Sequence, residues 1–113
     1  MKHITFAGKN FLVGDAIADA VLEYAAMLAE THEADSIDIN AIGADGDAVQ
    51  ATLFLSEGVA LVAETTTSSL PEPDNAETFA YIEGRLAVHV SGGPASFAVS
   101  DAVDPDEWLK TQL

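Results

Sequence analysis

The chain has 113 residues, of which 19 are Asp or Glu and 4 are Lys or Arg, so its formal charge is −15. This length predicts one globular domain spanning residues 1–113, and 49% of apolar residues is enough for a hydrophobic core. The absence of cysteine excludes disulfides, thiol catalysis and thiolate metal sites.

The charge argues against two classes of partner. Four bases, at positions 2, 9, 85 and 110, cannot form the basic stripe that displaces counterions from phosphates, so we expect no binding to nucleic acid. The longest apolar runs are far shorter than the roughly 20 residues of a bilayer span, and the first residues lack the pattern of a secretory signal. We therefore expect no membrane role and a cytoplasmic location.

The first predicted elements are a hairpin and a helix. Apolar residues alternate over 4–6 and 11–13 around a turn at 7–10, which predicts two paired strands. Gly14-Asp15 then supplies a turn and an N-cap. The stretch from there to about Thr31 is rich in Ala, Leu, Met and Glu, without Gly or Pro, and predicts a helix.

The predicted helix carries a broad apolar arc. At about 100° per residue, four side chains share one side, and Leu22 and Met27 widen the arc on its two flanks. Those four are Ile17, Val21, Tyr24 and Leu28. Contact with one sheet does not need so wide an arc, so we predict a second neighbour, either another helix of the chain or a partner subunit.

A second hairpin and a third strand follow. Alternation over 37–41 and 49–55 around a Gly-containing turn predicts a hairpin with one solvated face, and 59–63 is predicted as the next strand of the same meander. The long polar segment from Glu64 to Glu77 then places Leu70 as an apolar tip beside Glu72 and Asp74. This arrangement suits a protein contact, and a solvated connector is the alternative.

The C-terminal part leaves two alternatives open. Asp74 and Glu77 have the spacing of a capping box and predict a second helix. Residues 85–90 fit either the end of this helix or a strand paired with 95–100. Residues 104–110, which open with Asp and Pro and include Trp108, predict a short third helix.

The search for catalytic, cofactor-binding and metal-binding residues assigns none. The histidines at 3, 32 and 89 lie in different predicted elements, so no paired metal-ligand spacing exists. His32, close in sequence to Glu30, Glu33 and Asp35, is the best candidate for a metal ligand or a general base. The dipole at the helix C-terminus explains a histidine there equally well.

The segment Asp45-Gly46-Asp47 invites comparison with a calcium-binding loop. It fails the EF-hand register, because Val49 stands where a bidentate acid is required. A hairpin turn explains the same residues through backbone geometry alone, since glycine accepts a positive φ.

The N-terminal pattern resembles short, acidic, uncharacterised proteins of actinobacteria. The residues that carry this resemblance are Phe6-x-Gly8-Lys9-x-Phe11-x-x-Gly14-Asp15, Ala18-Asp19-Ala20 and Glu23-Tyr24-Ala25. It covers at most the first 30 residues and part of the hairpin after them. The resemblance implies a bacterial cytosolic origin and no assigned activity.

The sequence predicts an α+β fold, an antiparallel meander-type sheet with two or three helices packed on one face. We expect a small acidic, non-enzymatic protein-interaction module that self-associates and needs no cofactor. The interface residues predicted are Leu22, Met27, Leu70, Glu72 and Asp74. One alternative is an acidic decoy or immunity-type protein that binds a basic partner. Another is a small enzyme or ligand carrier whose pocket lies between sheet and helices near Tyr24 and Trp108.

Overall fold

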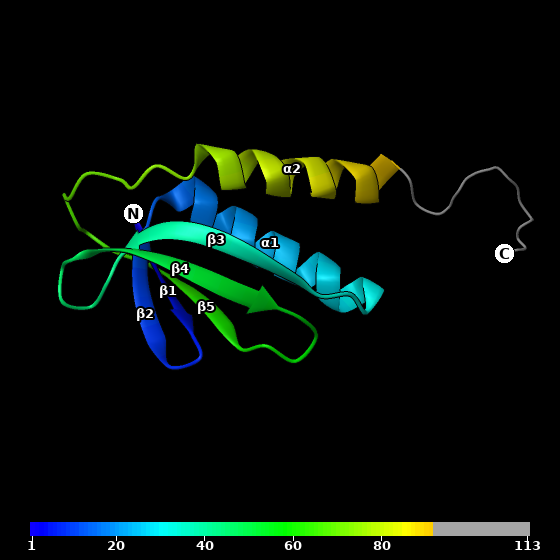
Figure 1. The fold of residues 1–113 in the computed structure, drawn as a ribbon, viewed down its shortest axis with the longest axis horizontal. Coiled ribbons are helices and arrows are strands. Elements are labelled where there is room, and N and C mark those ends of the chain that lie inside the picture. Colours follow the sequence, from blue (N-terminus) through cyan, green and yellow to red (C-terminus); the bar gives the residue numbers. More distant parts are fainter. Residues whose placement is uncertain (92–113) are drawn as a thin grey trace, which may run out of the picture. The chain divides into compact units, whose positions relative to one another are not determined.

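The computed structural model describes residues 1–91. These residues belong to two compact units, one spanning Met1–Ile82 and one that begins at Glu83. The first unit holds a sheet, one complete helix and the first turns of a second helix (Figure 1). The predicted strand at 95–100 and the predicted helix at 104–110 lie outside the described residues.

The fold is α+β, as the sequence predicts. In chain order the elements are β1 (Lys2–Phe6), β2 (Lys9–Val13), α1 (Asp15–Thr31), β3 (Asp35–Ile42), β4 (Ala48–Leu55), β5 (Leu61–Thr65) and α2 (Ala76–Ser91). The five strands form one sheet in the order β4-β3-β2-β1-β5, and neighbouring strands are antiparallel. Both predicted hairpins are present.

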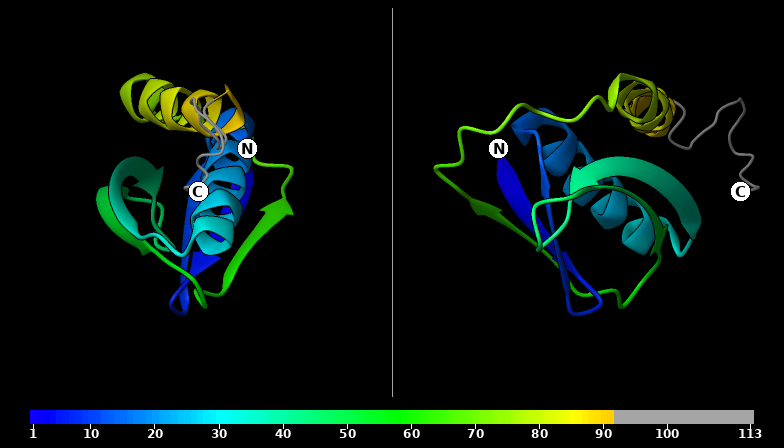
Figure 2. Two further views of the ribbon diagram at one scale, coloured as in Figure 1. Left: turned by 90° about the vertical axis from the view of Figure 1, so that its right-hand side faces the viewer. Right: turned by 60° about the vertical axis from the view of Figure 1, so that its left-hand side comes forward.

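The last strand departs from the predicted meander. β5 pairs with β1 over the whole of Lys2–Phe6 and so lies at the opposite edge of the sheet from β4 (Figure 2, left). A connection containing Gly58, with φ 89°, leads from β4 to β5. Alternation of apolar and polar residues fixes which face a strand buries but not which strand it joins, so the pattern over 59–63 did not specify the partner.

Helix α1 follows the predicted boundaries closely. Its N-cap is Gly14, in an extended conformation and without a side-chain cap, so Asp15 is the first helical residue rather than the cap. The helix ends at Thr31 and is followed by the C-cap residue His32, whose left-handed φ of 56° allows the N–H of Glu33 to bond the carbonyl of Leu28 at 2.9 Å. α1 contacts β1 and β5, and Figure 2 shows it running along the sheet.

The core lies between α1 and the strands. Its fully buried side chains, apart from one in α2, come from α1 and from the inward positions of four strands. The largest are Tyr24, Ile4, Leu28, Ile39, Leu53, Leu55, Ile82, Val13 and Val21. The chain itself covers one flank of the broad α1 arc, because Met27 is only 7% exposed, whereas Leu22 on the other flank is 38% exposed.

Helix α2 resolves one of the alternatives that the sequence leaves open. Residues 85–90 belong to this helix and not to a strand. Its start is capped by Asp74, whose Oδ1 accepts a hydrogen bond from the N–H of Ala76 at 3.0 Å. The predicted second helix is thus confirmed, but Asp74 bonds the N–H of Ala76 instead of that of Glu77, so the predicted capping box is not what begins it.

Candidate functional site

Strand β3 is unevenly paired along its two edges. On one side β4 pairs with it from Asp35 to Ile42, whereas on the other side β2 meets it only where Leu12 faces Ile42. Between Ser36 and Asn40 the main-chain groups on the β2 side therefore have no strand as a partner and are left to bond side chains or water.

The first turns of α2 supply those partners. The side-chain amide of Asn75 accepts from the N–H of Asn40 at 2.7 Å and donates to its carbonyl at 2.8 Å, as a paired strand would do. One turn further along, the hydroxyl of Thr78 donates to the carbonyl of Asp38 at 2.6 Å. The start of α2 thus takes the place of a neighbouring strand along this edge of β3.

The carboxylate of Asp35 joins α1, α2 and β3. The hydroxyls of Tyr24, from α1, and Tyr81, from α2, both donate to Oδ2 of Asp35, the first residue of β3, the latter at 2.5 Å. The two rings meet edge to face with centroids 6.3 Å apart. Tyr24 is fully buried, so the hydrogen bond satisfies a polar group inside the core.

A groove of about 550 Å³ lies over this junction. Its acidic lining residues are Asp38, Asp74 and Glu77, and no Lys, Arg or His from the described part of the chain lines it. Asp38 is held in place by a hydrogen bond from the hydroxyl of Thr52 at 2.6 Å. The groove is therefore rich in hydrogen-bond acceptors, and its chemistry favours a cationic group over an anion.

The same hydrogen bonds determine which main-chain groups of β4 face outward. Asp38 and Asn40 direct main-chain groups toward α2, and they stand opposite Thr52 and Gln50 in β4. In an antiparallel ladder such opposite pairs exchange no hydrogen bonds with each other. The N–H and C=O groups of Gln50 and Thr52 consequently face away from the sheet, and no strand among residues 1–91 lies beyond them.

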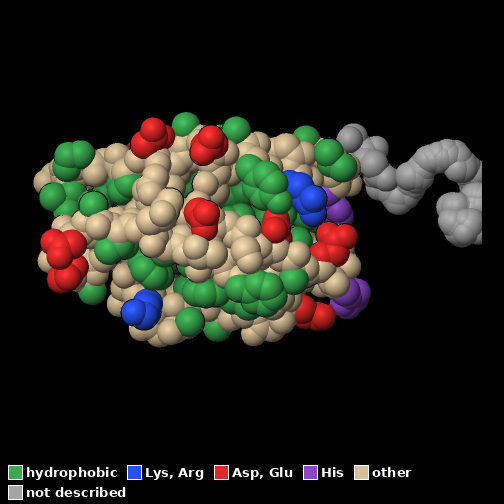
Figure 3. Space-filling view, viewed as in Figure 1, with side chains coloured by type: hydrophobic (Ala, Val, Ile, Leu, Met, Phe, Trp, Pro, Cys, Tyr) green, Lys and Arg blue, Asp and Glu red, His purple; other side chains and the backbone are tan. Residues whose placement is uncertain are grey.

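The two edges of the sheet differ in charge and length. β4 runs from Ala48 to Leu55 without a charged residue, although the chain carries 19 acids. β5 is shorter and contains Glu64. Figure 3 shows that carboxylates are dispersed over the face it displays instead of gathering into one patch. Proteins usually shorten or charge their edge strands to prevent pairing, so of the two edges formed by residues 1–91 the β4 edge is the less protected.

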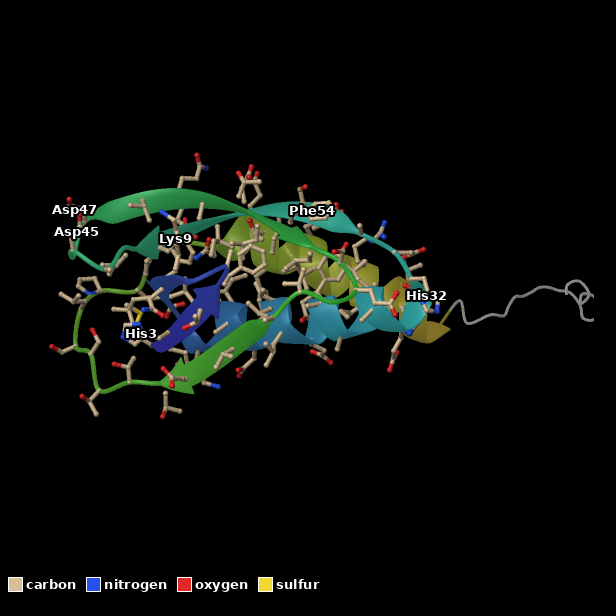
Figure 4. The ribbon with its side chains drawn as sticks, turned by 90° about the horizontal axis from the view of Figure 1, so that it is seen from below. His3, Lys9, His32, Asp45, Asp47 and Phe54 are labelled. Carbon is tan, nitrogen blue, oxygen red and sulfur yellow. The ribbon has the colours of Figure 1, made fainter. Side chains whose placement is uncertain are left out.

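The described residues form no metal site at His32 or at the Asp45–Asp47 turn. His32 is 75% exposed and lies 3.0 Å from Oε1 of Glu57, through its Nδ1. Within residues 1–91 no three His, Asp or Glu side chains are arranged to hold a metal ion. Figure 4 places His32 and the Asp45–Asp47 turn at opposite ends of the molecule.

The helices among residues 1–91 are too short or too polar to cross a bilayer.

The five predicted interface residues do not share one role. Met27 is buried in the core, whereas Leu22 and Leu70 are exposed. Glu72 lies against Gly14 at the start of α1 and leaves no room there for a Cβ. Asp74 caps α2 and accepts a hydrogen bond from the side chain of Asn40 through its carbonyl.

Sequence reasoning missed the residues that build the groove. Asn75 and Thr78 stand at the start of a helix, three positions apart, and the alternating polar positions of β3 include Asp38 and Asn40. Their types are suited to bonding an open strand edge, but nothing in the sequence indicates that β2 leaves β3 after one residue pair. Predicting the groove would have required knowing that β2 and β3 separate after that pair.

Comparison of the whole chain with protein-family profiles, with curated protein sequences and with solved structures returned no match.

Proposed function

We propose that the chain is a non-enzymatic protein-interaction module that self-associates. One observation carries the proposal, which is the uncharged outer edge of β4, with the main-chain donors and acceptors of Gln50 and Thr52 facing outward. Such an edge is a template for another strand. Phe54 in the same strand is 56% exposed and offers apolar area next to those groups.

The lack of charged residues in β4 allows a second copy to be the partner. Two chains of −15 repel each other wherever carboxylates meet, and pairing along β4 brings together segments that hold none. The arc of α1 supports this role less well than the sequence suggests. Met27 is covered within the chain, which leaves Leu22 as the exposed member of the two flanking residues.

The test is the molar mass of the full chain as a function of concentration. Sedimentation equilibrium should show reversible growth toward a dimer as the concentration rises. Gln50→Glu places one carboxylate on each β4 edge and should weaken dimerisation by about tenfold or more, because it brings two like charges close together at a junction that otherwise holds none.

The matched control is Thr65→Glu, which adds the same charge to the exposed end of β5 beside Lys2. It should leave the dimerisation constant within about twofold of the original, since it lies on the other edge. A mass that stays at 11.8 kDa at every concentration would overturn the proposed function.

A second candidate function, binding of a basic partner, is favoured by the groove at the start of α2. Its three carboxylates and the half-exposed ring of Tyr81 suit a Lys or Arg side chain. A labelled Lys-rich peptide should bind the protein with an affinity that falls as salt rises.

The groove itself is tested by paired substitutions. Asp38→Asn and Glu77→Gln should each weaken peptide binding, whereas Asp45→Asn, which removes a charge in the β3–β4 turn outside the groove, should change it little. Equal effects of all three variants would show attraction by net charge alone and exclude a groove site.

A further inference from the structure

We infer that two copies join their β4 strands antiparallel about a two-fold axis at Ala51, so that the two sheets become continuous. This inference rests on the proposed self-association and adds its register. Along β4 the main-chain N–H and C=O groups point alternately toward β3 and outward, away from the sheet. Gln50 and Thr52 direct their main-chain groups outward, and by the same alternation so do Ala48 and Phe54.

Main-chain bonding selects this register from those that a two-fold axis allows. With the axis at Ala51, Gln50 of one copy faces Thr52 of the other, and Ala48 faces Phe54. Every outward donor and acceptor of the strand then has a partner. An axis at Gln50 or at Thr52 leaves part of the strand without an opposing β4 residue, because β4 spans only Ala48–Leu55.

The side chains fit the same register. On the inner face Ala51 meets its own copy in a pair without hydrogen bonds, where Cα atoms approach to about 4.5 Å and a small residue is suitable. Val49 then faces Leu53 of the second copy, which is an apolar pair. At the strand end, Asp47 faces Leu55 rather than another carboxylate. The register therefore opposes no like charges along the strand.

The size of the contact sets the expected strength. One pair of eight-residue strands buries less than the roughly 1,200–2,000 Å² of a stable protein interface. The dimer should therefore be reversible and depend on concentration, which makes covalent trapping the suitable way to read its register.

The chain holds no cysteine, so a single introduced thiol reports one position without interference. Full-length Gln50→Cys, Ala51→Cys and Thr52→Cys are oxidised under mild conditions at a concentration where the mass shows dimer. Ala51→Cys should form covalent dimer about tenfold faster than either neighbour, because only this residue meets its own copy within disulfide range. Val62→Cys, exposed on β5, gives the rate of random collision.

A mixture of Gln50→Cys and Thr52→Cys tests the same register at two exposed positions and leaves Ala51 unchanged. These residues face each other across the proposed axis, so the mixed disulfide should form faster than either homodimer. This arm decides the question even where Ala51→Cys fails to fold.

The outcomes separate the register from the self-association. A dimer whose fastest trapping occurs between two copies of Gln50→Cys or of Thr52→Cys, without preference for the mixed pair, overturns the register and leaves the proposed function standing. A dimer trapped no faster than Val62→Cys places the contact elsewhere and also overturns the inference. A monomer at every concentration overturns both the register and the proposed function.

Discussion

A single amide side chain replaces a strand at the open edge of β3. Asn75, the residue immediately before α2, makes both hydrogen bonds that a strand residue would make to Asn40. The geometry is specific, since it needs a donor and an acceptor on one short side chain, and Asn supplies both. Asn75 therefore helps to fix the first turn of α2 against β3, together with the hydrogen bonds of Thr78 and Tyr81.

Replacing that residue should destabilise the protein measurably. Asn75→Ala leaves the N–H and C=O of Asn40 without their amide partner, and we expect the free energy of unfolding in urea to fall by about 1–2 kcal/mol. Asn10→Ala is the control, because Asn10 is exposed and accepts one hydrogen bond from Thr5. Its cost should stay within about 0.5 kcal/mol. Equal losses for the two variants would contradict the role of Asn75.

An exposed pair should be visible in the titration of one lysine. The ammonium of Lys2 donates to Asp19 at 2.6 Å, and this bond raises the pKa of Lys2 above its ordinary value of 10.5. Desolvation opposes the rise, and the charges of Asp19 and Asp15 add to it. Because the pKa is higher in the folded chain, the pair stabilises the fold below about pH 10.5 and loses this effect as the pH rises through the folded-state pKa.

Asp19→Asn removes the charged acceptor, so an NMR titration should show the pKa of Lys2 moving down toward 10.5. Asp45→Asn removes the same charge in the β3–β4 turn, which does not contribute to the Lys2 shift, and should leave the Lys2 titration where it was. An unchanged Lys2 pKa in Asp19→Asn would mean that the ion pair does not form in solution.

At the level of elements, two glycines should respond to alanine in opposite directions. Gly46, in the turn between β3 and β4, has φ 90°, and the space around it is open, so Gly46→Ala costs about 1–2 kcal/mol through the backbone alone. Gly84 lies inside α2 with open space around it, so Gly84→Ala should stabilise the fold by about 0.5–1 kcal/mol. Urea unfolding of both variants measures these changes. If both variants were stabilised, or both destabilised, the opposite effects expected for Gly46 and Gly84 would be contradicted.

The elements that the sequence predicts correctly are those with a local signal. α1 shows in a Gly- and Pro-free stretch with a 3.6-residue period, and each hairpin shows as two alternating runs around a short turn. The neighbour of β5 carries no such signal, because the pattern over 59–63 suits any strand with one buried face. The groove is harder still, since Asn75 and Asn40 are 35 residues apart and their meeting depends on where β2 ends.

At the level of the whole molecule, the net charge opposes every contact between copies. A chain of −15 is repelled by its own kind over the Debye length, which shrinks from about 30 Å at 0.01 M salt to about 10 Å at 0.1 M. The uncharged strand β4 reduces this repulsion at the contact itself but not beyond it. Association of copies should therefore strengthen as salt is added.

Sedimentation at two salt concentrations checks this expectation. The dimer dissociation constant should fall by about threefold or more between 0.02 and 0.3 M NaCl, because added ions screen the repulsion between the two chains. Binding of a Lys-rich peptide should change in the opposite direction over the same range. A dimer that weakens with salt would indicate pairing between opposite charges and would contradict the β4 contact.

The amide clamp at Asn40 has a consequence for hydrogen–deuterium exchange. The N–H of Asn40 is held by a side chain of the segment leading into α2, whereas alternate residues of β3 such as Ile39 direct theirs into the ladder with β4. Fraying of the helix start would release the Asn40 proton to solvent while the Ile39 proton stays protected. One strand thus holds two neighbouring reporters, and the difference between their exchange rates measures how often the first turn of α2 lifts away.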